Sequence, residues 1–130
     1  MDEIIKLDGI TYSVRYDEHG IKTILEQLGI DASAKFVLDG LVFYACSPRK
    51  LKSVWLALSL KYALSPSTVA VHLRNALISA EYNGGLKNID DILGVEFYDY
   101  DFGLTSKNFL AVLSRHLRLN DYIVVKNVEK

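Results

Sequence analysis

The sequence has few of the residues and runs that mark several large classes of protein. Its single cysteine, Cys46, excludes a disulfide within the chain, and a reducing cytoplasm is the expected location. No apolar run is long enough to span a bilayer, and the N-terminal segment MDEIIKLDG lacks the basic start and apolar core of a signal peptide. With 50% hydrophobic and 24% charged residues, the 130 residues predict a single globular domain over 1–130 and not a disordered chain.

Patterns that indicate catalysis or metal binding are also scarce. His19, His72 and His116 are scattered, and none lies at a metal-ligand spacing from Cys46. No phosphate-cradling glycine loop and no nucleophile elbow occurs. The acidic run within residues 90–101 lacks the glycine and the terminal glutamate of a calcium loop, so a solvated loop is expected there. We therefore expect no enzyme activity, no bound metal and no cofactor.

Acidic residues are absent from one long stretch, residues 40–80. That stretch carries five basic residues, so its charge is +5, whereas the whole chain has a net charge of −1. The five are Arg49, Lys50, Lys52, Lys61 and Arg74. Such a basic island is typical of a surface that contacts phosphate groups, and the alternative is chance clustering on a solvated face.

The same stretch predicts two amphipathic helices separated by a short break. Apolar residues of the first recur at helical spacing, at Leu51, Val54, Trp55 and Leu58. Those of the second recur in the same way, at Val69, Leu73, Ala76, Leu77 and Ala80. Ser65 is a natural N-cap, and Pro66 suits the first position of a helix. The arrangement predicts a helix-turn-helix in which Trp55 is buried against the second helix.

The remaining segments predict a mainly α fold with a small β-sheet. Asp8-Gly9 is a strong two-residue turn signal, so residues 1–18 are predicted as a β-hairpin. Residues 121–130 are β-rich and predict a C-terminal strand that joins the hairpin, because a lone hairpin is only marginally stable. Further helices are predicted over residues 21–28, 34–46, 89–93 and 106–119. Together with the helix-turn-helix pair they make a six-helix core over residues 21–120.

The order of these features from Ile21 to Asn120 resembles a known family. It is similar to the C-terminal effector domain of the sporulation master response regulator of Gram-positive spore formers. The most specific parts are RNALISAEYNGGLKNIDDILG, residues 74–94, and RHLRLN, residues 115–120. The segment LSPSTVAVHLRNAL, residues 64–77, also resembles the recognition helix of quorum-sensing regulators.

The resemblance implies a transcriptional regulator that binds double-stranded DNA as a homodimer. The family carries a receiver domain ahead of this one, whereas here about twenty residues, predicted as a hairpin, precede the similar region. The last helix would form the dimer, through Phe109, Leu113, His116 and Leu117. Paired helix-turn-helix units read half-sites about one DNA turn apart, which fits a dimer.

A helical wheel of the second helix assigns roles in DNA binding. The face opposite the buried stripe would read bases through Thr68, Val71, Arg74 and Asn75. Arg74 suits guanine, Asn75 suits adenine, and Val71 suits a thymine methyl group. The phosphate contacts would be Arg49, Lys50, Lys52, Lys61 and Ser67.

An alternative function is a protein-interaction module that keeps the fold but does not read DNA. The family reads bases with arginine and glutamate early in the recognition helix, whereas the matching positions here are Thr68, Ala70 and Val71. Val71 and Ile78 would then be apolar contacts on an outer helix face. Such a module would act as an antagonist or adaptor of another regulator protein.

Overall fold

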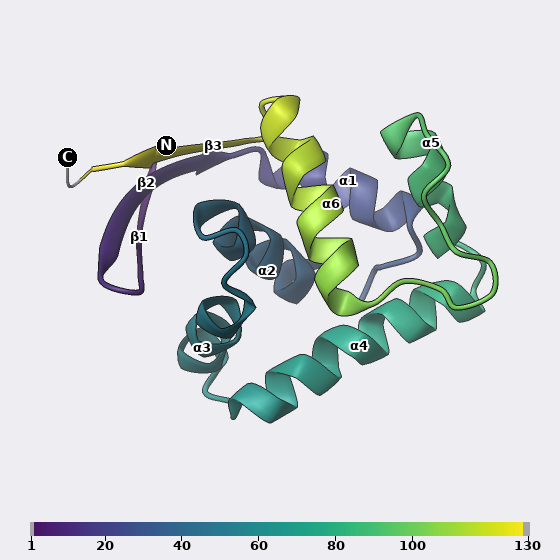
Figure 1. The fold of residues 1–130 in the computed structure, drawn as a ribbon, viewed down its shortest axis with the longest axis horizontal. Coiled ribbons are helices and arrows are strands. Elements are labelled where there is room, and N and C mark those ends of the chain that lie inside the picture. Colours follow the sequence, from purple (N-terminus) through teal and green to yellow (C-terminus); the bar gives the residue numbers. More distant parts are fainter. Residues whose placement is uncertain (1, 129–130) are drawn as a thin grey trace.

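Within residues 2–128, which the computed structural model describes, the protein is mainly helical with a small antiparallel sheet (Figure 1). The helices are α1 (Glu18–Gln27), α2 (Ala34–Cys46), α3 (Leu51–Tyr62), α4 (Pro66–Tyr82), α5 (Ile89–Leu93) and α6 (Ser106–Leu119), with a 3₁₀ turn, η1, over Leu86–Asn88. The strands are β1 (Glu3–Leu7), β2 (Ile10–Tyr16) and β3 (Ile123–Asn127). The predicted fold class, six helices with a small sheet, is confirmed.

The sheet joins the two ends of the chain in the order β1-β2-β3. Asp8 and Gly9 form the hairpin turn with φ values of 55° and 79°, the left-handed conformation that tight hairpin turns require. β3 pairs antiparallel with β2, with Tyr16 opposite Ile123. The predicted pairing of the hairpin with a C-terminal strand is therefore confirmed.

Helix α2 forms the centre of the core, where it contacts α1, α3, α6 and the sheet (Figure 1). Eleven of its thirteen residues are buried, as its apolar sequence predicts. Gly40 lies in the middle of this helix, where a Cβ atom would meet Leu58 and Leu110 at 3.6 and 3.7 Å. These are ordinary van der Waals distances, and they show that α3 and α6 both contact α2 at this point.

Helix α1 begins three residues earlier than the sequence pattern predicts. The Asp17 side chain accepts the N–H of Gly20 at 2.9 Å and so caps the helix. This cap satisfies a donor of the first turn, which extends the helix over polar residues that the apolar stripe does not include.

The apolar stripe of α6 packs inside its own chain, which corrects the predicted dimer surface. Phe109, Leu113 and Leu117 are each 0% exposed because they fill the core against α2. They cannot contact a second copy in this fold, and of the predicted dimer residues only His116 is partly exposed. Its backbone carbonyl accepts a hydrogen bond from the Asn120 side chain at 2.9 Å.

Trp55 is only half-buried, which corrects its predicted place in the core. The fully buried side chains of α3 are Val54 and Leu58, at 0% exposure. The core therefore contacts a narrower strip of α3 than the apolar spacing predicts, and Trp55 lies at its edge.

Within residues 2–128, no single helix has both the length and the apolar character needed to cross a membrane. Helices α3 and α4 meet that requirement only when taken together, and they are bent by 97° at their junction.

Candidate nucleic-acid interface

Helices α3 and α4 form the predicted helix-turn-helix. Their axes differ in direction by 97°, which lies in the range of about 90–120° that is usual for this motif. The turn is made possible by Ala63, whose φ of 54° reverses the chain. The Ser59 hydroxyl bonds to the Leu64 carbonyl, and the Leu64 N–H donates to the Ser59 carbonyl at 3.1 Å. These bonds tie the turn to the last part of α3.

The first turn of α4 is capped as the sequence predicts. The Ser65 side chain accepts the N–H of Thr68 at 3.2 Å, and Pro66 occupies the first helical position. The Thr68 hydroxyl lies 2.8 Å from the Ser65 hydroxyl and is half-buried, so Thr68 is held by the cap. Pro66 has no N–H, and the N–H of Thr68 is already bonded to Ser65. The N–H of the exposed residue Ser67 is therefore the one in this turn that can bind a ligand.

The outer face of α4 presents the other predicted base-reading residues. Arg74 and Asn75 are exposed, and Val71 is 52% exposed. Val71 and Asn75 also line a shallow hollow with Ser67, Thr68 and His72. The opposite face, led by Val69 and Leu73, is buried in the core. No acidic residue occurs in α4 before Glu81, so this face is free of negative charge over four turns.

His72 is a further residue of this face; it lies within the segment that resembles quorum-sensing regulators, but no DNA contact was predicted for it. Its ring is exposed, and its centroid lies 5.9 Å from that of Phe36 on α2. Its place one helical turn after Thr68 was the available signal, because residues four apart share a helix face.

Two of the five cations of the basic island are paired with carboxylates of the same chain. Lys50 lies 2.8 Å from Asp8 in the hairpin turn, and this hydrogen bond raises the pKa of Lys50. Lys61 lies 3.0 Å from Asp39. Both acids lie outside residues 40–80, so the charge pattern along the sequence did not reveal these pairs. Their charges are already compensated, which weakens both lysines as phosphate contacts.

The other three cations, Arg49, Lys52 and Arg74, form no ion pair with residues 2–128. Arg49 lies in the link between α2 and α3 with a φ of 75°, and Lys52 lies in the first turn of α3. Both are exposed. These two residues and Ser67 are the predicted phosphate contacts that the fold leaves available.

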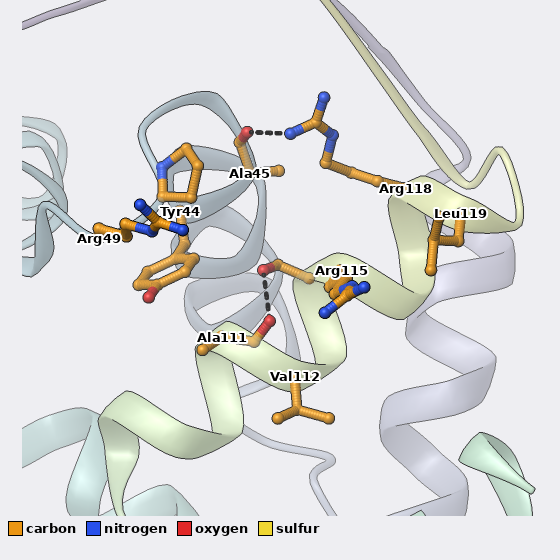
Figure 2. Close-up of a pocket in the computed structure, with 10 residues that line it drawn as sticks. Tyr44, Ala45, Arg49, Ala111, Val112, Arg115, Arg118 and Leu119 are labelled. Atoms are coloured by element: carbon orange, nitrogen blue, oxygen red, sulfur yellow. Dashed lines mark hydrogen bonds between the residues drawn. The ribbon is translucent and has the colours of Figure 1, made fainter.

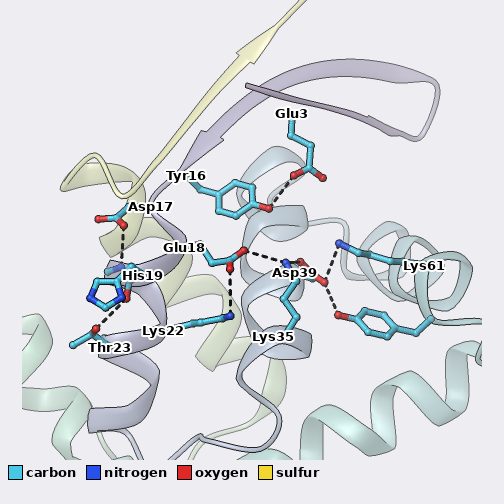
Figure 3. A network of polar contacts seen from close by, with 12 residues as sticks. Glu3, Tyr16, Asp17, Glu18, His19, Lys22, Thr23, Lys35, Asp39 and Lys61 are labelled. Carbon is cyan, nitrogen blue, oxygen red and sulfur yellow. Dashed lines mark hydrogen bonds and ion pairs between the residues drawn. The ribbon is translucent and has the colours of Figure 1, made fainter. Parts of the chain in front are cut away.

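Asp39 is a buried carboxylate that joins α2 to the end of α3 (Figure 3). It is 3% exposed and accepts a hydrogen bond from the Tyr62 hydroxyl at 2.5 Å. Lys61 and Lys35 complete its shell, with Lys35 at 3.4 Å. Burial raises the pKa of Tyr62, and the hydrogen bond to Asp39 adds to this effect. The sequence signal was an isolated acid in an apolar helix, which must find partners when buried.

The described residues offer little for other chemistry. No group of three His, Cys, Asp or Glu side chains within residues 2–128 is arranged to hold a metal ion. Cys46 is buried, and this burial raises the pKa of its thiol to about 12. At neutral pH the thiol is therefore protonated and a poor nucleophile.

Comparisons with known proteins identify no relative: no family model, no curated protein and no solved structure matches the chain.

Proposed function

We propose that this protein binds double-stranded DNA through α4 and regulates transcription. One observation carries the proposal: α4 stands at 97° to α3 and exposes a face without acidic residues from Pro66 to Ala80. A helix presented in this way fits the major groove, whose width admits an α-helix.

Base contacts would come from the middle of α4. Arg74 can donate two hydrogen bonds to guanine, Asn75 can pair with adenine, and Val71 can contact a thymine methyl group. These three side chains are exposed. With one arginine on this face, we expect a modest sequence preference.

Phosphate contacts would come from the start of each helix and from the link before α3. Ser67 offers its hydroxyl and its N–H, and the unpaired cations Arg49 and Lys52 supply charge. Arg49 and Lys52 would displace about two counterions, which gives a salt slope of about −2, and the slope would be about −3 if Arg74 contacted a phosphate instead of a base. If Lys50 and Lys61 left their carboxylates to bind DNA, the slope would be about −4 to −5.

The salt slope therefore tests the proposal. Binding of a fluorescent mixed-sequence duplex is measured by anisotropy at several salt concentrations. Lys52→Ala should weaken binding to all sequences and flatten the slope by about one unit. Arg74→Ala should cost about 1–3 kcal/mol at a preferred site and relax selection at one base pair. Arg15→Ala on β2 is the control, because this exposed cation lies outside the motif.

The variant Asp8→Asn should strengthen DNA binding, in contrast to the variants that weaken it. It frees Lys50 from its ion pair, so DNA binding should become tighter and the slope steeper by up to about one unit. Asparagine tolerates the left-handed conformation of Asp8, so the hairpin turn should persist. Absence of binding at about 50 mM salt, or binding insensitive to Lys52→Ala and Arg74→Ala, would contradict the proposal.

A second candidate function is the protein-interaction module. Exposed apolar side chains on the outer faces of both helices favour it: Leu56 and Leu60 on α3 are 56% and 78% exposed, and Val71 and Ile78 on α4 are 52% and 41% exposed. A regulator of the family that this chain resembles would be the partner. Calorimetric titration of such a regulator, with Val71→Ser and Ile78→Ser as variants, separates this function from DNA binding.

A further inference from the structure

A groove lined by arginines lies between the end of α2 and the outer side of α6 (Figure 2). We call it the arginine groove; its volume is about 860 Å³. Tyr44, Ala111 and Val112 are among its apolar lining residues, and Arg49, Arg115 and Arg118 are its charged ones. No acidic residue lines it. Arg118 donates to the Ala45 carbonyl at 3.3 Å, which fixes one side of the groove.

A second unusual surface is the acidic loop, residues 95–102, between α5 and α6. It carries two strongly exposed aromatic side chains, Tyr100 at 73% and Phe102 at 89%. Glu96, Asp99 and Asp101 belong to the same loop, are exposed and give it a negative charge. Exposed apolar side chains that gather on one part of a surface often mark an interaction site.

Internal hydrogen bonds hold the acidic loop in shape. Asp90 accepts the N–H groups of Phe97 and Tyr98 at 2.9 and 2.7 Å. Asp99 accepts those of Asp101 and Phe102 at 2.9 and 3.1 Å with its side chain. The loop is therefore ordered before binding, which lowers the entropy lost when it docks.

The two surfaces complement each other in charge and in chemistry. Three arginines and an apolar floor match three carboxylates and two aromatic rings. Arginine also stacks favourably on aromatic faces, and aromatic and arginine residues dominate binding energy at interfaces. Figure 1 places the loop on the opposite side of α6 from the C-terminal end of α2, so the two surfaces of one molecule face different directions.

We propose that the acidic loop of one copy of this protein docks in the arginine groove of a second copy. The contact joins two different surfaces, so each copy retains a free loop or a free groove and can bind a further copy. Because each contact joins only one loop to one groove, we expect a weak association, which salt weakens further by screening the charges.

Sedimentation velocity of the full chain tests this proposal over about 10 μM to about 1 mM. The average mass should rise with concentration and fall when salt is added. Phe102→Ser in the loop and Arg115→Glu in the groove should each weaken association by about tenfold or more. Both residues are exposed, so these variants should fold normally. Ile4→Thr and Arg15→Glu, at exposed positions on β1 and β2, are controls and should not alter association.

A mixture of the two variants gives the sharpest result. The loop variant keeps an intact groove, and the groove variant keeps an intact loop, so an equimolar mixture should form dimers that grow no further. A wild-type chain that stays monomeric at about 1 mM would overturn the proposal. So would a mixture that does not associate, or variants that associate as strongly as the wild type.

Discussion

Helices α4 and α6 carry similar apolar repeats, but the fold covers them to different extents. In α6 the apolar stripe, including Phe109 and Leu113, is fully buried. In α4 one stripe is buried in the same way, but Val71 and Ile78 remain on the outer face, 52% and 41% exposed. The comparison distinguishes apolar residues that are buried in the core from apolar residues that remain exposed to solvent. The second kind is where binding should be sought.

The largest expected effect tests the placement of the α6 stripe in the core. Phe109→Ala should lower the free energy of unfolding by about 3–5 kcal/mol, because a fully buried ring would leave a cavity. Chemical denaturation followed by circular dichroism measures the change. Lys107→Ala, at an exposed position on the same helix, is the control. Unchanged stability would mean that this face is not covered by the chain's own core.

The next effect concerns Asp39, the buried carboxylate of α2 that contacts Tyr62 and Lys61 at the end of α3. Asp39→Asn should lower the free energy of unfolding by about 1–3 kcal/mol, because it removes the charge that pairs with Lys35 and Lys61. The estimate is at the low end for a buried ion pair because both lysines are partly exposed. Asp31→Asn, an exposed change ahead of α2, is the control. Equal melting temperatures for the two variants would show that Asp39 does not tie these helices together.

A smaller effect is expected at Trp55, at the edge of the core. Trp55→Ala should cost about 1–2 kcal/mol, less than Phe109→Ala, because the indole is only half-buried. Denaturation curves recorded by circular dichroism give both values on one scale. Since Trp55 is the only tryptophan, its fluorescence in the folded protein should also be quenched by acrylamide. A loss as large as that of Phe109→Ala would place the indole in the core.

The smallest change in stability is expected on the outer face of α4. Val71→Ser and Ile78→Ser should each alter the free energy of unfolding by no more than about 0.5 kcal/mol, because both side chains already contact water. Binding to DNA or to a protein partner should change instead, and the same variants serve both assays. A marked loss of stability would show that these residues belong to the core after all.

Local signals predicted much of the fold. The Asp8-Gly9 turn, the Ser65 cap with Pro66 and the apolar α2 all appear where the sequence placed them. Each depends on neighbouring residues, so the sequence pattern contains the needed information. The beginning of α1 was missed because its cap, Asp17, precedes polar residues that show no stripe.

The candidate site was less predictable, because charge along the chain is not charge in space. The stretch without acids appeared to offer five free cations, but the fold brings Asp8 to Lys50 and Asp39 to Lys61. Both pairs join residues that lie more than twenty positions apart, so the charge pattern of a short segment does not reveal them.

By itself, the sequence determined the elements and the helix-turn-helix, because caps, turns and apolar periodicity act over a few residues. Only the tertiary structure decided which surface each stripe meets. An apolar stripe is equally suited to its own core or to a second molecule, and the packing of α6 on α2 resolved that choice for Phe109, Leu113 and Leu117. It likewise left Val71 and Ile78 in solvent, since α4 contacts the core along one side only.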